Sequence, residues 1–185
     1  MNGELEKALL EGEPQAFERL FDRYAVPLAR LSFYFLANAS EAEDAVQDTL
    51  MGFIQALRSG RFHGGNGTLN AYLRSSVSNK CIDRLRKRGV LHLSYEDMGD
   101  ETIALSAQSD WPSQALDDKR IRQAIERAVQ ALPPAQRSVI VLRILEEYSY
   151  RDIAETLGIS LNYVKNLIAR ARARLSKEIE PFLKG

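Results

Sequence analysis

The sequence has little of several features that would place a protein in a specialised class. Its 185 residues include one cysteine, two histidines and one tryptophan. A single cysteine cannot form an intrachain disulfide, and Cys81, His63 and His92 are too few to complete a structural zinc site. No apolar run approaches the roughly 20 residues of a membrane-spanning helix, and residues 1–13 are acidic rather than typical of a secretory signal. We therefore expect a cytoplasmic protein with no metal or other cofactor and no membrane insertion, in which Cys81 is a small packing residue.

Net charge is also absent, but the charged side chains are unevenly distributed. The chain has 25 basic and 25 acidic side chains, yet residues 1–60 and 93–118 are net negative by 5 and 7, and residues 61–92 and 119–185 are each net positive by 6. Such blocks predict two surfaces that meet polyanions and two that meet cations or repel nucleic acid. A charge run can also be an ordinary solvated helix face, so this alternative stays open for any one block.

Strand-like alternation is missing as well, and apolar residues instead recur at the three-and-four spacing of amphipathic helices. The fold class is therefore predicted to be all-α, with three or four helices in a first domain and a second helical domain after an acidic segment. Ser40 with Glu43 resembles a capping box that opens the helix over residues 42–57. The predicted bounds are residues 1–88 for the first domain, 89–115 for a flexible acidic linker and 116–185 for the second domain.

Residues 150–170 read YRDIAETLGISLNYVKNLIAR, a pattern that predicts a helix-turn-helix. Gly158 suits the positive φ of the turn, and Ser160 is a natural N-cap for the second helix. Turning the apolar positions inward leaves five side chains expected to project outward: Asn162, Tyr163, Lys165, Asn166 and Arg170. Asn, Lys and Arg can read base edges in the major groove, while Arg172 and Arg174 are better placed for phosphates. A helical hairpin that touches no nucleic acid is the alternative, but some seven constrained positions agree with DNA binding.

The helix expected from Ala42 carries acidic residues on one side. Glu41, Asp44 and Asp48 fall on adjacent turns, and the buried stripe consists of Val46, Leu50, Phe53 and Leu57. Favourable interaction with the helix dipole accounts for acids in the first turn but explains Asp48 poorly. The acidic face therefore predicts a docking surface for a basic partner.

The glycine-rich stretch RFHGGNGTLN, residues 61–70, is the only segment that suggests nucleotide chemistry. It lacks the Lys-Ser/Thr ending of a phosphate-binding P-loop and follows no strand. We expect no enzymatic activity.

The chain resembles the extracytoplasmic-function (ECF) type of RNA polymerase sigma factor over nearly its whole length. The resemblance is carried by FERLFDRYAVPLARL, AEDAVQDTLMGFIQAL and YLRSSVSNKCIDRLRKR in the first domain and by ALPPAQRSVIVLRILEEYSYRDIAETLGIS in the second. The resemblance implies a transcription initiation factor with two sigma-type domains, regions 2 and 4. Such a factor binds core RNA polymerase, directs it to promoter DNA, and is commonly held by an anti-sigma factor.

The resemblance also implies roles for individual residues. Binding to core polymerase falls to Glu41, Asp44, Gln47 and Asp48. Recognition and melting of the minus-10 element fall to Phe62, His63, Asn66, Asn79, Lys80, Asp83, Arg84, Arg86, Lys87 and Arg88. Recognition of the minus-35 element falls to Arg151, Ser160, Asn162, Tyr163, Lys165, Asn166, Arg170, Arg172 and Arg174. The acidic linker would thread through the polymerase and mimic RNA, or else act as a plain tether.

The sequence departs from the family at several of these places, which leaves the promoter sequence undetermined. Tyr72 stands where Trp is usual, and Leu161, Asn162 and Tyr163 replace a common Gly-Thr pair on the recognition helix. Two other interpretations remain. One is a stand-alone helix-turn-helix regulator whose first domain binds a ligand or dimerises, and the other is a helical adaptor that binds no DNA.

Overall fold

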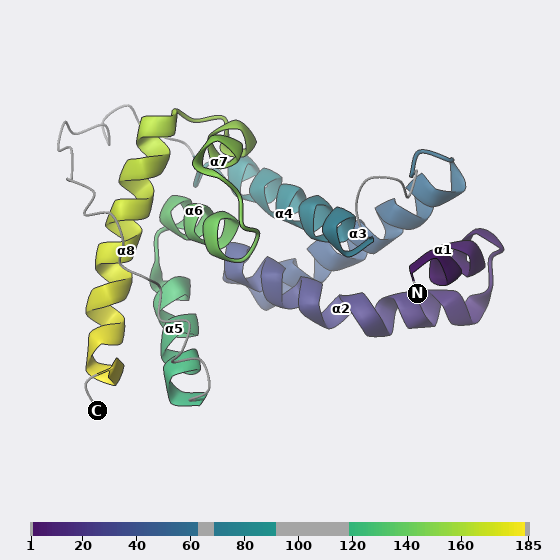
Figure 1. The fold of residues 1–185 in the computed structure, drawn as a ribbon, viewed down its shortest axis with the longest axis horizontal. Coiled ribbons are helices and arrows are strands. Elements are labelled where there is room, and N and C mark those ends of the chain that lie inside the picture. Colours follow the sequence, from purple (N-terminus) through teal and green to yellow (C-terminus); the bar gives the residue numbers. More distant parts are fainter. Residues whose placement is uncertain (1, 63–68, 92–118, 184–185) are drawn as a thin grey trace. The chain divides into compact units, whose positions relative to one another are not determined.

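The computed structural model describes residues 2–62, 69–91 and 119–183, and every element in these ranges is an α-helix, so the all-α prediction is confirmed (Figure 1). The chain divides into two compact units, Met1–Leu85 and Arg86–Gly185. The predicted linker, residues 89–115, lies almost entirely outside the described residues, and the predicted domain bounds stay predictions. Within the described ranges, no helix has the length and apolar character needed to cross a membrane.

The first unit is built from α1 (Asn2–Leu10), α2 (Pro14–Leu36), α3 (Ala39–Arg58) and α4 (Leu69–Lys87), whose last two residues fall in the second unit. Helices α2 and α3 pack along each other, and α1, which the sequence analysis did not predict, packs on both. The buried stripe of α4 repeats every four residues, a spacing that places each member about one turn above the one before it, on neighbouring parts of the helix surface. Its members are Leu69, Leu73, Val77, Cys81 and Leu85, all essentially inaccessible to solvent. Cys81 is therefore a packing residue, as predicted.

The N-cap of α3 lies two residues before the Ser40 cap that the sequence pattern suggested. This N-cap is Asn38, whose side-chain oxygen accepts a hydrogen bond from the Glu41 backbone N–H at 3.1 Å. Ser40 lies inside the first turn, so the predicted capping box of Ser40 and Glu43 is wrong. Asn38 is the N-cap because its amide oxygen accepts a hydrogen bond from a backbone N–H that has no partner within the helix.

The second unit contains α5 (Lys119–Ala131), α6 (Pro134–Ile144), α7 (Tyr150–Leu157) and α8 (Leu161–Leu183). The long helix α8 packs against each of the other three. Its inward face is apolar at helical spacing, and the buried residues there include Val164, Ile168, Ala171 and Leu175. Helix α8 is therefore the support on which the shorter helices are assembled.

One buried arginine ties two of these helices together. The Arg137 guanidinium donates hydrogen bonds through Nη1 to the backbone oxygens of Gln130 and Leu132, at 3.1 and 3.0 Å. These carbonyls lie at the end of α5, where a helix has no internal donors left for them. Burial lowers the pKa of Arg137 from its ordinary value. Arg137 thus stabilises the packing of α6 against the end of α5, and because it is buried it is not part of the basic surface of this unit.

Candidate functional site

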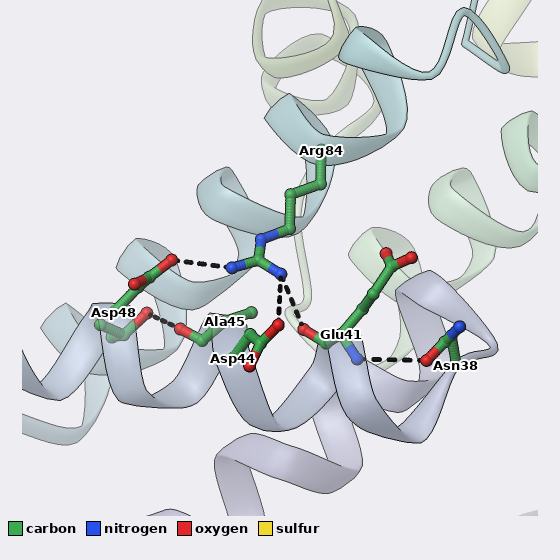
Figure 2. Close-up of polar contacts among 7 residues, drawn as sticks. Asn38, Glu41, Asp44, Ala45, Asp48 and Arg84 are labelled. Atoms are coloured by element: carbon green, nitrogen blue, oxygen red, sulfur yellow. Dashed lines mark hydrogen bonds and ion pairs between the residues drawn. The ribbon is translucent and has the colours of Figure 1, made fainter.

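The predicted acidic face lies on α3, outside its buried stripe (Figure 2). The side chains of Asp44 and Asp48 are 61% and 58% exposed, Gln47 is exposed and Glu41 is half-buried. Sequence reasoning missed Met51, which follows Asp48 by three residues and is 54% exposed. A signal was available, because Met51 falls outside the apolar stripe of its helix. The face therefore combines carboxylates with one solvent-exposed thioether, a side chain that adapts readily to a partner surface.

Arg84 of α4 reaches this face and contacts α3 at three points (Figure 2). Its Nη2 donates to Asp48 Oδ2 at 2.7 Å, and its Nη1 donates to the Glu41 backbone oxygen at 3.1 Å. The same Nη1 lies 3.9 Å from Asp44 Oδ2, within ion-pair range. Arg84 was predicted to act on the minus-10 element, whereas in the structure its guanidinium joins α4 to α3.

Three aromatic rings gather where the chain leaves α3 and enters α4. The ring of Phe62 meets those of Phe53 and Tyr72 edge-on, with centroid distances of 5.1 and 5.0 Å, and Phe53 and Tyr72 are 5.8 Å apart. Edge-to-face pairs of this kind contribute beyond simple burial. Phe62 was predicted to act on the minus-10 element, but its ring is half-buried in this cluster. The other two loop candidates, His63 and Asn66, lie outside the described residues.

The remaining minus-10 candidates lie on α4 and just beyond it. Lys80 is half-buried, and the exposed members are Asn79, Asp83, Arg86, Lys87 and Arg88. Arg86, Lys87 and Arg88 are consecutive, so several positive charges gather at the helix end, where cations also complement the helix dipole. This end of α4 is suited to a polyanion.

The helix-turn-helix has the local geometry predicted for it. Gly158 adopts φ 68°, in the left-handed region that the turn requires, and the Ser160 Oγ accepts from the Tyr163 backbone N–H at 3.2 Å as the N-cap of α8. Sequence reasoning missed the cap of α7, a reciprocal capping box between Ser149 and Asp152. The hydrogen bonds from Ser149, through its side chain and then its backbone, lower the pKa of Asp152.

The structure places the predicted minus-35 residues in three different environments. Arg151, Ser160, Asn162 and Arg174 are exposed, and the half-buried group consists of Lys165, Asn166, Arg170 and Arg172. Tyr163 is only 8% exposed, so the prediction that it projects outward is wrong. An aromatic ring beside the stripe of Val164 and Leu167 removes far more apolar area from water inside the unit than outside it.

The described residues hold no group of three or more His, Cys, Asp or Glu side chains suited to a metal ion. Cys81 lies in the core, and burial raises the pKa of its thiol to about 11, so it is held as a neutral thiol at physiological pH. The positive charge of Arg84 opposes this shift but does not reverse it.

Comparisons with known proteins match both parts of the chain to described families. Residues 20–90 match the family described as Sigma-70 region 2, and residues 122–175 match Sigma-70, region 4. The chain is 32% identical to the ECF RNA polymerase sigma factor SigM of Mycobacterium tuberculosis, over 95% of this chain and 83% of that protein. It is 30% identical to the ECF RNA polymerase sigma factor SigE of Mycolicibacterium smegmatis, over 86% of this chain but only 60% of that protein.

Among solved structures, the chain is similar to the sigma factor RpoE from Bartonella quintana, crystallised in complex with the anti-sigma factor NepR. The TM-score is 0.54 at 25% sequence identity, and the match covers 89% of this chain and 96% of that one.

Proposed function

Since the chain belongs to the ECF type of RNA polymerase sigma factors, which direct RNA polymerase to promoters, we propose how its surfaces divide that task. The α3 face of Asp44, Gln47, Asp48 and Met51 binds core polymerase. Helix α4 and the loop before it hold the melted minus-10 strand, and α8 reads the duplex minus-35 element. All catalysis comes from the polymerase, in the cytoplasm where it transcribes.

One observation carries the polymerase assignment: α3 keeps two carboxylates more than half exposed beside an exposed methionine. Charged groups at the rim of an interface steer association with an oppositely charged partner, and an apolar centre supplies buried area. Such a face suits a basic, helical protein surface better than it suits DNA, whose phosphates it would repel.

The test replaces Gln47 by arginine, because Gln47 borders the carboxylates without contacting Arg84 in the structure. Gln47→Arg adds a long cation to a face that meets a basic partner, so the affinity for core polymerase should fall at least about tenfold. Gln15→Arg on α2 makes the same chemical change at another exposed helical position and should bind as the unaltered chain does. Titration of core polymerase against fluorescently labelled full chains measures both. Equal affinity of the two variants would contradict the assignment.

For the minus-10 element, we propose that the exposed amide of Asn79 contacts an unpaired base. Lys80, Arg86, Lys87 and Arg88 then hold the strand backbone. Single strands are bound in positively charged grooves, and a base taken out of the stack needs polar partners for its edge. The arrangement of polar and basic side chains along α4 supports both requirements.

For the minus-35 element, we propose that the amino-terminal half of α8 enters the major groove. Asn166 has the two hydrogen-bonding groups needed to pair with a base edge, whereas Lys165 and Arg170 are suited to phosphates or guanine. Asn162, Arg151, Arg172 and Arg174 would surround this contact, and the capped helix start at Ser160 directs backbone N–H groups toward a phosphate.

Two further proposals concern regulation. The similar RpoE was crystallised with an anti-sigma factor, and we propose that a protein of this kind also restrains the present chain. The acidic segment of residues 89–115 would run through the polymerase along a path otherwise taken by RNA, because it carries five acids and no lysine or arginine. Both proposals concern binding partners and give the chain no catalytic role.

A further inference from the structure

Arg84 links the surface proposed for polymerase to the helix proposed for DNA. Its guanidinium contacts Asp48, Asp44 and the Glu41 backbone oxygen, all on α3, although its own helix α4 carries the minus-10 candidates (Figure 2). The hydrogen bond to Asp48, at 2.7 Å, has the short length typical of a charge-assisted pair. The Arg84 side chain is only 26% exposed, so this interaction is partly shielded from water and salt.

We propose that Arg84 is a positioning residue for polymerase binding: it fixes the carboxylates of α3 in their docking geometry and holds α4 in register with them. The inference rests on the proposed role of the α3 face. It differs from the sequence-based assignment, in which Arg84 acts on the minus-10 element.

The geometry leaves room for a partner while Arg84 stays in place. A carboxylate offers about four acceptor positions on its two oxygens, and Arg84 occupies one oxygen of Asp48. Because both aspartates remain more than half exposed, a basic partner can approach them from the solvent side. Arg84 then holds the aspartates in place and does not compete with the partner for them.

Lysine is unable to reproduce this arrangement. Arginine donates from a planar fork, and here Nη2 serves Asp48 while Nη1 serves the Glu41 carbonyl and approaches Asp44. A lysine ammonium keeps the positive charge but is a single point on a flexible stem. Arg84→Lys therefore separates the effect of charge from the effect of the fork.

The proposal can be tested by whether removal of Arg84 raises or lowers the affinity for core polymerase. Removing a cation from an acidic face should strengthen attraction to a basic partner if Arg84 only neutralises Asp44 and Asp48. If Arg84 positions them, removal should weaken binding in spite of the more negative face. If Arg84 acts only on DNA, affinity for polymerase should not change.

The experiment measures the affinity of full-length chains for core polymerase without DNA, well below the unfolding temperature of each variant. We expect about a tenfold loss for Arg84→Met, comparable to losing one charge-assisted hydrogen bond, and a smaller loss of about threefold for Arg84→Lys. Arg19→Met is the matched control, since Arg19 forms an exposed ion pair with Glu13 on the same unit, and it should bind within about twofold of the unaltered chain. A purely structural role would shift the unfolding midpoint but leave the affinity of the folded protein unchanged.

A second comparison connects the loss to Asp48. Asp48→Asn alone should weaken polymerase binding, and adding Arg84→Met to it should cost much less than Arg84→Met costs alone, because the positioned carboxylate is already gone. Fully additive losses, or unchanged or increased affinity of Arg84→Met, would overturn the proposal. If Gln47→Arg also binds normally, the role of the α3 face fails as well; if Gln47→Arg binds weakly while Arg84→Met does not, only the positioning role fails.

Discussion

At the scale of single residues, contacts inside the protein decide which polar and aromatic side chains remain available for partners. Tyr163 is buried beside the apolar stripe of α8, and Phe62 packs edge-on against Phe53 and Tyr72. Asn166, three residues after Tyr163, is only half-buried. Neighbouring positions on α8 therefore differ in what they can contact: Tyr163 packs in the core, whereas Asn166 stays partly accessible to a partner.

Substitutions at Tyr163 and Asn166 should separate the packing role of Tyr163 from the base readout proposed for Asn166. Tyr163→Ala should destabilise the folded chain by about 3 kcal/mol, as expected for truncating a buried aromatic ring, whereas Tyr163→Phe should retain most of the stability. Asn166→Ala should leave stability nearly unchanged but relax the preference for one or two base pairs of the minus-35 element, at about 1–3 kcal/mol. Chemical denaturation and binding to a panel of single-base promoter variants provide the two measurements. Loss of base preference in a stable Tyr163→Phe protein would instead assign readout to the tyrosine.

At the scale of elements, helix ends fix where the functional faces begin. The start of α3 is set by Asn38, and the acidic face follows within the first turns. In the second unit the reciprocal cap of Ser149 and Asp152 opens α7, and Ser160 caps α8 after the left-handed Gly158. Caps satisfy backbone donors that would otherwise lack partners, so they determine where each helix begins.

Two alanine substitutions at the start of α3 test this assignment directly. Asn38→Ala removes the side-chain acceptor for the Glu41 N–H and should lower the free energy of unfolding by about 1 kcal/mol. Ser40→Ala is the matched comparison inside the first turn and should be close to neutral, because alanine has the higher helix propensity. Urea denaturation of the two full-length variants gives the difference. A larger loss for Ser40→Ala would restore the capping box that the sequence pattern suggested.

At the scale of the whole molecule, zero net charge results from sequence segments of opposite net charge, for which different partners are proposed. The acidic first 60 residues include the α3 face, and the basic residues 61–92 include α4 and the glycine-rich loop. The acidic block thus includes the surface proposed for a basic protein, and the basic block includes the surface proposed for a melted strand. The helix-turn-helix of the second unit is the surface proposed for the duplex, so the proposed duplex binding and the proposed strand opening involve separate parts of the chain.

This division predicts that Asn79 acts when DNA opens and has little part in duplex binding. Asn79→Ala removes the amide proposed to contact an unpaired base, so transcription from a closed promoter should fall about tenfold or more. The same promoter with a pre-melted minus-10 region should be affected much less, because unpairing has already taken place. Run-off transcription with core polymerase on the two templates makes the comparison. An equal loss on both would argue against a role in melting.

The sequence by itself determined the helical class, the helix-turn-helix, the acidic face of α3 and the family. Each of these depends on local periodicity, on residue types with fixed conformational preferences, such as Gly158 and Ser160, or on a motif combination specific enough to identify relatives. It also placed Cys81 in the core, because that residue falls on the four-residue repeat of α4.

Only the tertiary structure decided which neighbours those residues meet. Arg84 contacts Asp48 across 36 positions of sequence, and no local pattern reports a contact of that separation. Burial of Tyr163 and the pairing of Phe62 with Tyr72 likewise depend on how helices and the chain between them pack. A side chain that is exposed on an isolated amphipathic helix lies in the core once another element covers it, and this covering is a property of the assembled fold.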